Sequence, residues 1–369
     1  MADEELTLVT VVVADADKVK AEKAKADKAE KVEAQKFQNL GKWASEFVGE
    51  KLPVRSVLLA IGNDAPWMPA GRLGILASAG GKGKTALLMH LASHVAAGID
   101  WCGLKVVRSG AVALVLGEED EDECRRRLDD VWRSMPPDGS KRAAKKTLVL
   151  PLAATGDNRL VVERHGGTAE GSPRAEELVA YLQTEGEKVG GWSLVVVDPF
   201  ARFCGMNAET DNASATSTMT VLEELTKLPG NPTVLVAHHT RKRGKDDGGG
   251  DLVELVRGAS AIKDAARWVA MLDADPPDEH GAGRSVLRVV KSNYTSTAYG
   301  LELETKYGVP VSGKLRPVAQ LDAEAGERKA EAEADKKART KIKPAPRPQA
   351  IGAGASANER RNPSKATVI

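Results

Sequence analysis

The chain has little cysteine, no excess charge of either sign and no long apolar run. Its three cysteines, Cys102, Cys124 and Cys204, are too few and too scattered for a disulfide framework or a zinc site, which favours a reducing, cytoplasmic environment. No stretch approaches the roughly 18 uninterrupted apolar residues of a membrane span, so we expect no membrane association. The first residues are acidic, and no basic segment precedes an apolar core, so we expect no signal peptide.

The charge balance and the scarcity of aromatic residues limit the partners that the chain can recognise. Lys plus Arg (53) nearly equals Asp plus Glu (52), so any nucleic-acid surface has to be a local patch. Aromatic residues make up only 4% of the chain, which leaves little material for base stacking. The 42% of hydrophobic residues, over 369 positions, suits one large domain with extensions or two modest domains.

Apolar runs separated by helical stretches predict an α/β fold. Near-continuous apolar runs that alternate with helices indicate a mainly parallel, twisted sheet covered by helices on both faces. The expected strands are residues 71–77, 111–116, 147–150, 193–197, 233–237, 268–272 and 285–290.

The two ends of the chain differ in composition from its centre. We predict an N-terminal charged helical extension over residues 1–50, in which residues 15–36 are almost only Ala, Lys, Glu, Asp and Val. The main domain is expected over residues 51–320, and a low-complexity basic tail, disordered or loosely helical, over residues 321–369. Apolar residues that mark the return of folding into the main domain are Phe37, Leu40, Trp43, Phe47, Leu52 and Val54.

A glycine-rich octet follows the first expected strand of the main domain and precedes an apolar helix. Glycines allow the backbone N–H groups to point at one centre, and the helix N-terminus adds partial positive charge there. A lysine in this position reaches the β- and γ-phosphates of a nucleotide, and the following hydroxyl ligates Mg²⁺. We therefore predict a phosphate-binding loop for ATP and Mg²⁺, although Ser78 replaces the usual first glycine. The octet is Ser78, Ala79, Gly80, Gly81, Lys82, Gly83, Lys84 and Thr85.

Carboxylates follow two other expected strands, where ligands of parallel sheets usually bind. Asp198 comes after four apolar residues and is predicted to face the water shell of Mg²⁺; the simpler alternative is a turn cap. Glu118 comes after Gly117 and is the predicted general base, with Glu119 as the alternative. The acidic residues from Glu119 to Glu123 are otherwise typical of the first turn of a helix.

Histidines occur in two pairs. At the end of the strand over residues 233–237, His239 is predicted to sense the γ-phosphate, and His238 to pack on the other face because successive strand side chains alternate. His90 and His94 have helical spacing, but no Glu follows His90, so we interpret them as ordinary helix residues.

The order of these motifs resembles that of RecA-like ATPases of the RepA type. These are hexameric replicative helicases of plasmids and phages, more distantly related to DnaB. The resemblance covers about residues 50–315 and rests on the phosphate loop, the Gly-Glu-Glu-Asp segment, Asp198-Pro-Phe-Ala-Arg-Phe, the His238 segment and the stretch from Arg257 to Arg267-Trp. It implies a RecA-like core, a ring of usually six subunits with ATP sites between neighbours, and single-stranded DNA in the central channel.

The resemblance also implies roles for individual residues. Glu118 matches the catalytic glutamate and Asp198 the Mg²⁺-side aspartate, while His239 matches the γ-phosphate sensor. Arg267 stands where the family places an arginine finger, which acts on the ATP of the neighbouring subunit. Secondary candidates for that role are Lys291 and Arg257; for Arg267 and Lys291 the simpler alternative is a surface salt bridge.

DNA-contacting segments are expected at residues 199–215 and 241–256. The second has local positive charge and glycines, which suits a mobile loop that follows a phosphate backbone, but an ordinary flexible surface loop fits equally well. Its basic residues are Arg241, Lys242, Arg243 and Lys245. Two features depart from the family: Ser78-Ala79 stands where Ala-Pro is frequent, and we see no large N-terminal domain of the DnaB kind. Loading on DNA would then differ or need a partner, such as a replication initiator or primase.

These observations predict an ATP-dependent DNA helicase of replication that works as a homo-oligomeric ring. Two alternatives stay open. One is a RecA-like recombination or repair ATPase that binds single-stranded DNA without unwinding it. The other is a nucleotide-binding regulatory module with little turnover.

Overall fold

A computed structural model describes residues 41–63, 65–163, 169–240, 252–256 and 260–341. The residues before Ser56 and those from Ser56 onward form two separate units. In the first unit, the described part is an irregular segment with one short 3-10 helix, η1 (Ala44–Phe47). Its described large apolar side chains are exposed, Leu52 and Val54 by 86% and 92%, whereas Phe37 and Leu40 lie outside the described residues.

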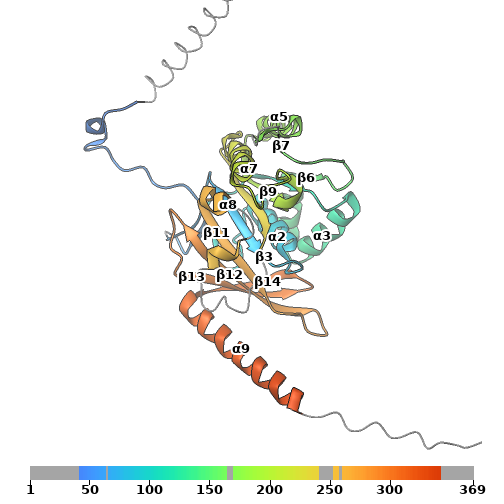
Figure 1. Cartoon of the computed structure of the whole chain (residues 1–369). Coiled ribbons are helices and arrows are strands. Elements are labelled where there is room, and N and C mark those ends of the chain that lie inside the picture. The colour runs from blue at the N-terminus through green and yellow to red at the C-terminus, as the bar shows by residue number, and fades with distance from the viewer. Residues whose placement is uncertain (1–40, 64, 164–168, 241–251, 257–259, 342–369) are drawn as a thin grey trace, which may run out of the picture. The chain divides into compact units, whose positions relative to one another are not determined.

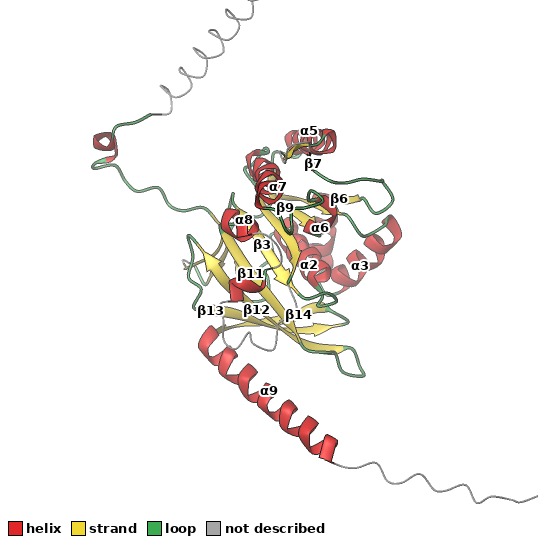
Figure 2. Ribbon diagram, viewed as in Figure 1, coloured by secondary structure: helices red, strands yellow, loops and turns green. Residues whose placement is uncertain are grey.

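The second unit is built on a nine-stranded sheet (Figures 1 and 2). Its strand order is β14-β13-β12-β11-β3-β10-β9-β5-β6, and the six strands from β11 to β6 are parallel, whereas β12, β13 and β14 are antiparallel. The parallel strands are β3 (Leu73–Ser78), β5 (Ala111–Leu116), β6 (Thr147–Pro151), β9 (Trp192–Asp198), β10 (Thr233–His239) and β11 (Trp268–Ala274). The antiparallel ones are β12 (Ala282–Ser292), β13 (Tyr299–Lys306) and β14 (Val309–Pro317).

Helices cover both faces of the parallel part. Alternate residues of β5 enter two different hydrophobic clusters, since Val112 and Leu114 pack with one set of helices and Ala113 and Val115 with the other. Helices of the first cluster are α2 (Lys84–Ala97), α3 (Glu121–Arg133) and α4 (Pro137–Lys146). Those of the second are α5 (Pro173–Lys188), α6 (Phe200–Phe203), α7 (Asn212–Glu224) and α8 (Ser260–Ala265). The predicted α/β class with a mainly parallel sheet is confirmed.

Every strand expected from the sequence is present, with ends shifted by a few residues. The strands that sequence analysis missed are antiparallel or very short, and their apolar runs are brief or interrupted by polar residues. Besides β13 and β14, they are β1 (Val57–Ile61), β2 (Ala65–Pro69), β4 (Lys105–Val106), β7 (Val161–Glu163) and β8 (Ala169–Gly171). Single 3-10 turns, η2 (Leu225–Lys227) and η3 (Leu252–Leu255), complete the elements.

A small antiparallel sheet, β2-β1-β4, is attached to the main sheet through tryptophans. The rings of Trp67 and Trp268 are 5.4 Å apart, and Trp268 Nε1 donates a 3.0 Å hydrogen bond to the carbonyl of Trp67. Trp101 Nε1 donates to His90 Nδ1 at 2.9 Å, and burial lowers the pKa of His90 to about 3. His90 is therefore a neutral hydrogen-bond acceptor inside the core, as an ordinary helix residue would be.

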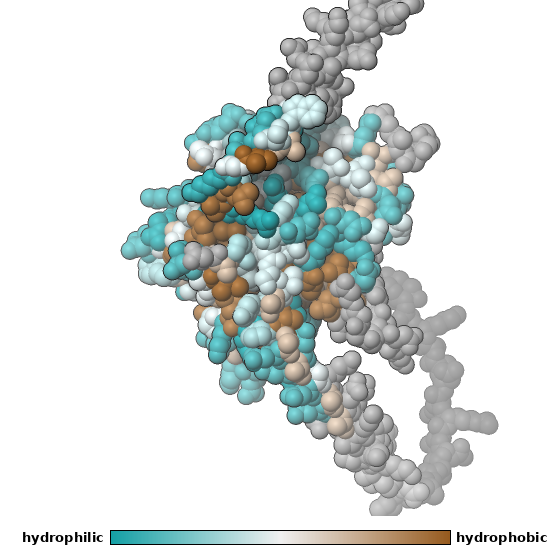
Figure 3. Space-filling view, turned by 90° about the vertical axis from the view of Figure 1, so that its left-hand side faces the viewer, coloured by the Kyte–Doolittle hydropathy of each residue, from teal (hydrophilic) through white to brown (hydrophobic). Residues whose placement is uncertain are grey.

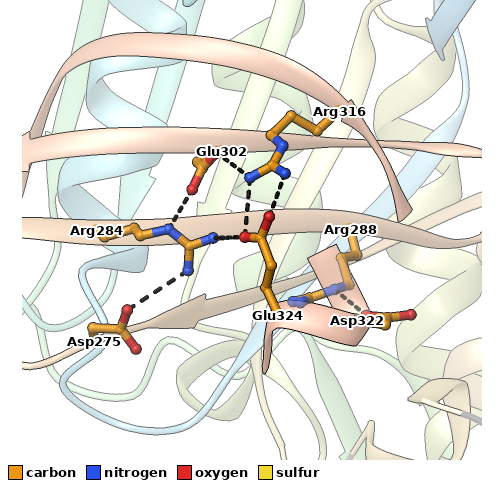
Figure 4. Close-up of polar contacts among 7 residues, drawn as sticks. All are labelled: Asp275, Arg284, Arg288, Glu302, Arg316, Asp322 and Glu324. Atoms are coloured by element: carbon orange, nitrogen blue, oxygen red, sulfur yellow. Dashed lines mark hydrogen bonds and ion pairs between the residues drawn. The ribbon is translucent and has the colours of Figure 1, made fainter. Parts of the chain in front are cut away.

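The chain continues past β14 as helix α9 (Val318–Lys341), where we expected a disordered or loosely helical tail. Leu321 is fully buried, and its Cδ1 lies where a side chain on Gly300 of β13 would be. Six arginine and carboxylate pairs lie among Asp275, the strands β12 to β14 and the start of α9 (Figure 4). The first turns of α9 therefore belong to the folded core.

Hydrophobic residues of the described chain lie on the molecular surface as well as along the helices. On the face drawn in Figure 3, hydrophobic residues form separate patches between hydrophilic ones. Within the described part of the chain, none of the helices combines the length and the apolar character that crossing a bilayer requires. The longest, α9, is rich in charged residues.

Candidate active site

The glycine-rich octet forms the turn between β3 and α2. Gly81 and Gly83 have φ angles of +72° and +81°, in the left-handed region that glycine adopts without strain. Gly83 precedes the first residue of α2, so the free N–H groups of this helix end face the turn. The turn therefore forms a cradle of backbone donors at the carboxyl edge of the sheet.

Lys84 is buried and faces back into this turn. Its Nζ donates to the carbonyl and the hydroxyl of Ser78, at 3.3 and 3.0 Å, and to the carbonyl of Ala79 at 3.3 Å. Burial lowers the pKa of Lys84, while the charges of Asp198 and Glu118 act in the opposite direction. The ammonium group is thus held over the cradle by neutral oxygens that an incoming phosphate can replace.

Two residues of the octet have contacts that sequence analysis did not foresee. Ser78, at the position usually held by glycine, accepts from Lys84 through its hydroxyl and donates to the carbonyl of Ala79 at 2.8 Å. Lys82 Nζ donates to the carbonyl of Ala274 at 2.5 Å, which ties the turn to the end of β11. The serine is compatible with the cradle because, unlike Gly81 and Gly83, it does not have a positive φ.

Asp198 ends β9 and lies at the same edge. It is 3% exposed and is hydrogen-bonded to Thr85, and its Oδ2 has no hydrogen-bond partner. Burial raises the pKa of Asp198, although the Thr85 hydrogen bond and the charge of Lys84 oppose this. A buried carboxylate oxygen without a partner is costly, so it marks a position where a cation or its water shell fits.

The two candidate bases after β5 have different surroundings. Glu118 is exposed, and its Oε1 accepts a 3.1 Å hydrogen bond from Arg202 Nε of α6. Glu119 is 7% exposed, with Arg127 of α3 3.5 Å away, and burial together with the charge of Asp198 raises its pKa. Glu118 is the one that water can reach freely. Arg202 lies in a segment that the sequence singled out, but nothing in the pattern indicated its contact with Glu118.

The paired histidines at the end of β10 point to opposite faces. His239 Nδ1 lies 3.4 Å from Lys84 Nζ, next to the cradle. His238 is 1% exposed and its ring packs edge-on against Phe200, with centroids 4.8 Å apart. The alternation expected for a strand is present, and it brings His239 beside Lys84 at the cradle.

The residues at this edge fit a magnesium nucleotide. Backbone donors and Lys84 suit phosphate oxygens, and the Thr85 hydroxyl with the Asp198 carboxylate suits the water shell of Mg²⁺. In the described part of the chain, no group of three or more His, Cys, Asp and Glu side chains could hold a metal ion by itself. Mg²⁺ is usually held by few protein ligands together with substrate phosphates.

Arg267 lies away from this cradle. It precedes β11, is exposed, and its backbone N–H donates to the carbonyl of Leu73 at the start of β3. Because β3 and β11 are parallel, Arg267 and Ser78 are separated by the length of β3, about 16 Å. Arg267 therefore lies at the opposite edge of the sheet from the phosphate cradle of its own chain.

Lys291 is close to Arg267 but has partners of its own. Its Nζ donates to the carbonyls of Lys263 and Asp264, at 2.6 and 3.2 Å, at the end of α8. Burial lowers its pKa, and Arg267 contributes in the same direction. Lys291 thus stabilises the end of α8, next to Arg267. The other candidate residues, Arg257, Arg241, Lys242, Arg243 and Lys245, lie outside the described residues.

A parallel sheet with a phosphate cradle after β3, a buried aspartate after β9 and a glutamate after β5 defines a P-loop NTPase with a RecA-like core. A scan against protein families matches residues 34–245 to the AAA domain family. The match covers more than half of the 369 residues, and the chain belongs to this family. Membership supports ATPase chemistry, which uses a nucleotide and usually Mg²⁺.

Proposed function

We propose that this protein is an ATP-dependent DNA helicase of the RepA type that acts in replication as a homo-oligomeric ring. Single-stranded DNA passes through the central channel of the ring and is bound there by loops that line the channel. The observation that carries the ATPase part is the meeting of Lys84, Asp198 and Glu118 at one edge of the sheet. The resemblance in motif order supports the helicase part, as does the position of Arg267.

Each side chain then has a chemical task in hydrolysis. Lys84 and the cradle amides bind the phosphates of ATP, and Thr85 and Asp198 hold the water shell of Mg²⁺. Mg²⁺, when bound, neutralises charge on the β- and γ-phosphates. Glu118 accepts a proton from the attacking water. His239, whose Nδ1 lies 3.4 Å from Lys84 Nζ, responds to loss of the γ-phosphate and moves the segment that follows β10.

Arg267 supports hydrolysis in trans. It lies about 16 Å along the sheet from its own cradle, so it reaches a phosphate only on a neighbouring subunit. Arginine fingers of this kind stabilise charge on the transferring phosphoryl group and raise rates by about 10³–10⁵ in other NTPases.

The test measures ATP hydrolysis by the full chain with and without an oligo-dT strand, with Lys84→Ala as the inactive control. Displacement of a strand from a forked duplex is measured in parallel, and the mass of the assembly is determined with ATP. DNA-stimulated hydrolysis, strand displacement and a ring mass support the proposal.

The alternatives predict other results. Hydrolysis with coating of single strands but no displacement would favour a recombination or repair ATPase. Absence of turnover with and without DNA would overturn the proposal in favour of a regulatory nucleotide-binding module.

A further inference from the structure

An ion pair links the candidate base to a helix that begins two residues after Asp198. Arg202 Nε donates to Glu118 Oε1 at 3.1 Å, and the two side chains are 59% and 47% exposed. Exposed ion pairs add little to stability. The main consequence of this pair is therefore the position in which it holds the carboxylate.

The backbone segments that carry Glu118 and Arg202 are joined by a hydrogen bond and by close packing. The Gly117 N–H donates to the carbonyl of Asp198 at 2.8 Å, which joins the ends of β5 and β9. A Cβ on Gly117 would lie 2.7 Å from Arg202 Cβ and 3.0 Å from the Phe203 ring. Phe203 is 1% exposed, so α6 is anchored in the core. The absence of a side chain at Gly117 lets α6 approach β5, and the Arg202 side chain starts from a fixed point.

Glu118 lies within the electrostatic reach of a second cation. Its negative charge acts on Lys84 of the cradle, where it opposes the larger effect of burial on the pKa of that lysine. Lys84 and Arg202 therefore both attract the same carboxylate. Without Arg202, only Lys84 of these two cations would attract Glu118, and the carboxylate would no longer be held toward α6.

We propose that Arg202 is a positioning residue that holds the Glu118 carboxylate at the rim of the cradle, where it can accept a proton from water. Arg202 acts through Glu118 and does not itself touch the reacting atoms. The inference rests on the proposed ATP hydrolysis and adds the residue that orients its base.

The first test compares variants in steady-state hydrolysis. Arg202→Ala is expected to lower kcat about tenfold, because a displaced catalytic group is costly, with the KM for ATP within about twofold. Arg202→Lys keeps the positive charge and is expected to recover part of the rate. Arg125→Ala is the matched control, because Arg125 forms a similarly exposed pair with Glu121 on α3, 2.5 Å apart, and its removal should leave the rate unchanged.

The second test places Arg202→Ala in a Glu118→Gln background. If Arg202 acts through Glu118, the double variant has the residual rate of Glu118→Gln alone, since effects of residues that act as a unit are not additive. Thermal midpoints and ATP binding of all variants show whether each is folded.

The outcomes separate this inference from the proposed function. A wild-type chain that does not hydrolyse ATP overturns both. If the wild type is active, three results overturn the role of Arg202 alone: an unchanged kcat in Arg202→Ala, a raised kcat, or a further loss in the Glu118→Gln background.

Discussion

At the scale of single residues, the neighbouring carboxylates Glu118 and Glu119 at the carboxyl edge of the sheet have different surroundings. Glu118 is half exposed and paired with Arg202, whereas Glu119 is buried beside Arg127 and within the field of Asp198. The sequence alone left the choice of base open between them.

Substitution of each glutamate in turn tests which of the two is the general base. Glu118→Gln is expected to lower kcat by about 10²–10⁴, the usual contribution of a general base. Glu119→Gln should lower it less than about tenfold, because Glu119 is enclosed by protein and does not face free water. Single-turnover ATP hydrolysis measures both, and a larger loss in Glu119→Gln would transfer the role of base to that residue.

Burial of the Asp198 carboxyl has a cost in stability that depends on pH. Burial raises its pKa, so the folded state favours the neutral carboxyl more than the unfolded state does. The cost is absent below the unfolded pKa, at about pH 4, and grows as the pH rises through the folded value.

Asp198→Asn is therefore expected to stabilise the nucleotide-free protein near neutral pH. We expect its thermal midpoint to exceed that of the wild type by about 2–4 °C at pH 8, and to equal it near pH 4. Hydrolysis of MgATP should be lost. Scanning calorimetry at both pH values measures the difference, and a lower midpoint for the variant at pH 8 would contradict the argument.

At the scale of elements, α9 is attached to the antiparallel strands by both packing and charge. Arg316 of β14 donates to Glu302 at 3.1 Å and to Glu324 of α9 at 3.0 Å, while Arg288 of β12 donates to Asp322 at 2.9 Å (Figure 4). The Arg316 hydrogen bonds lower the pKa of Glu324. Ionised Glu324 is therefore favoured by docking of the helix.

The sign of this shift predicts how the docking depends on pH. A carboxyl with a lowered pKa stabilises the fold above its unfolded value and loses that effect as the pH falls through the folded value. Glu324→Gln should lower the thermal midpoint at pH 7 by a small amount, and the difference should shrink as the pH falls below the unfolded value of about 4 and through the lower folded pKa of Glu324. Glu327→Gln on the same helix is the control, and an equal effect of both variants would exclude the role given to Arg316.

At the scale of the whole molecule, the predicted functional residues lie at both ends of the parallel strands. The cradle, Asp198 and Glu118 lie at the carboxyl edge, and Arg267 lies at the amino edge. One chain cannot bring the two together, since they are separated by about 16 Å of sheet. A head-to-tail interface between copies would place the amino edge of one chain against the cradle of the next.

Mixing two inactive variants tests this arrangement. Lys84→Ala and Arg267→Ala should each lose at least about 10²-fold in kcat. In an equimolar mixture, about a quarter of the interfaces would combine an intact cradle with an intact Arg267, so activity should return. Native mass measurement shows whether mixed assemblies form, and inactive mixed assemblies would contradict a role in trans.

Much of the fold followed from local patterns. The apolar runs of the parallel strands and the glycines of the cradle depend on residues close together in the chain, so their expected positions agree with the structure. The antiparallel strands β13 and β14 were missed, because each apolar stretch is short and interrupted by charges. Helix α9 was missed as part of the core, because a single buried Leu321 and pairs with distant arginines attach it.

By itself, the sequence determined which side chains end the strands, since backbone preferences and apolar spacing act over a few neighbouring residues. Only the tertiary structure decided which of them meet. It joined Arg202 to Glu118 across 84 positions, buried Glu119 and placed Arg267 at the far edge of the sheet. Contacts of this kind depend on strand order and on the packing of both faces, which no local pattern encodes.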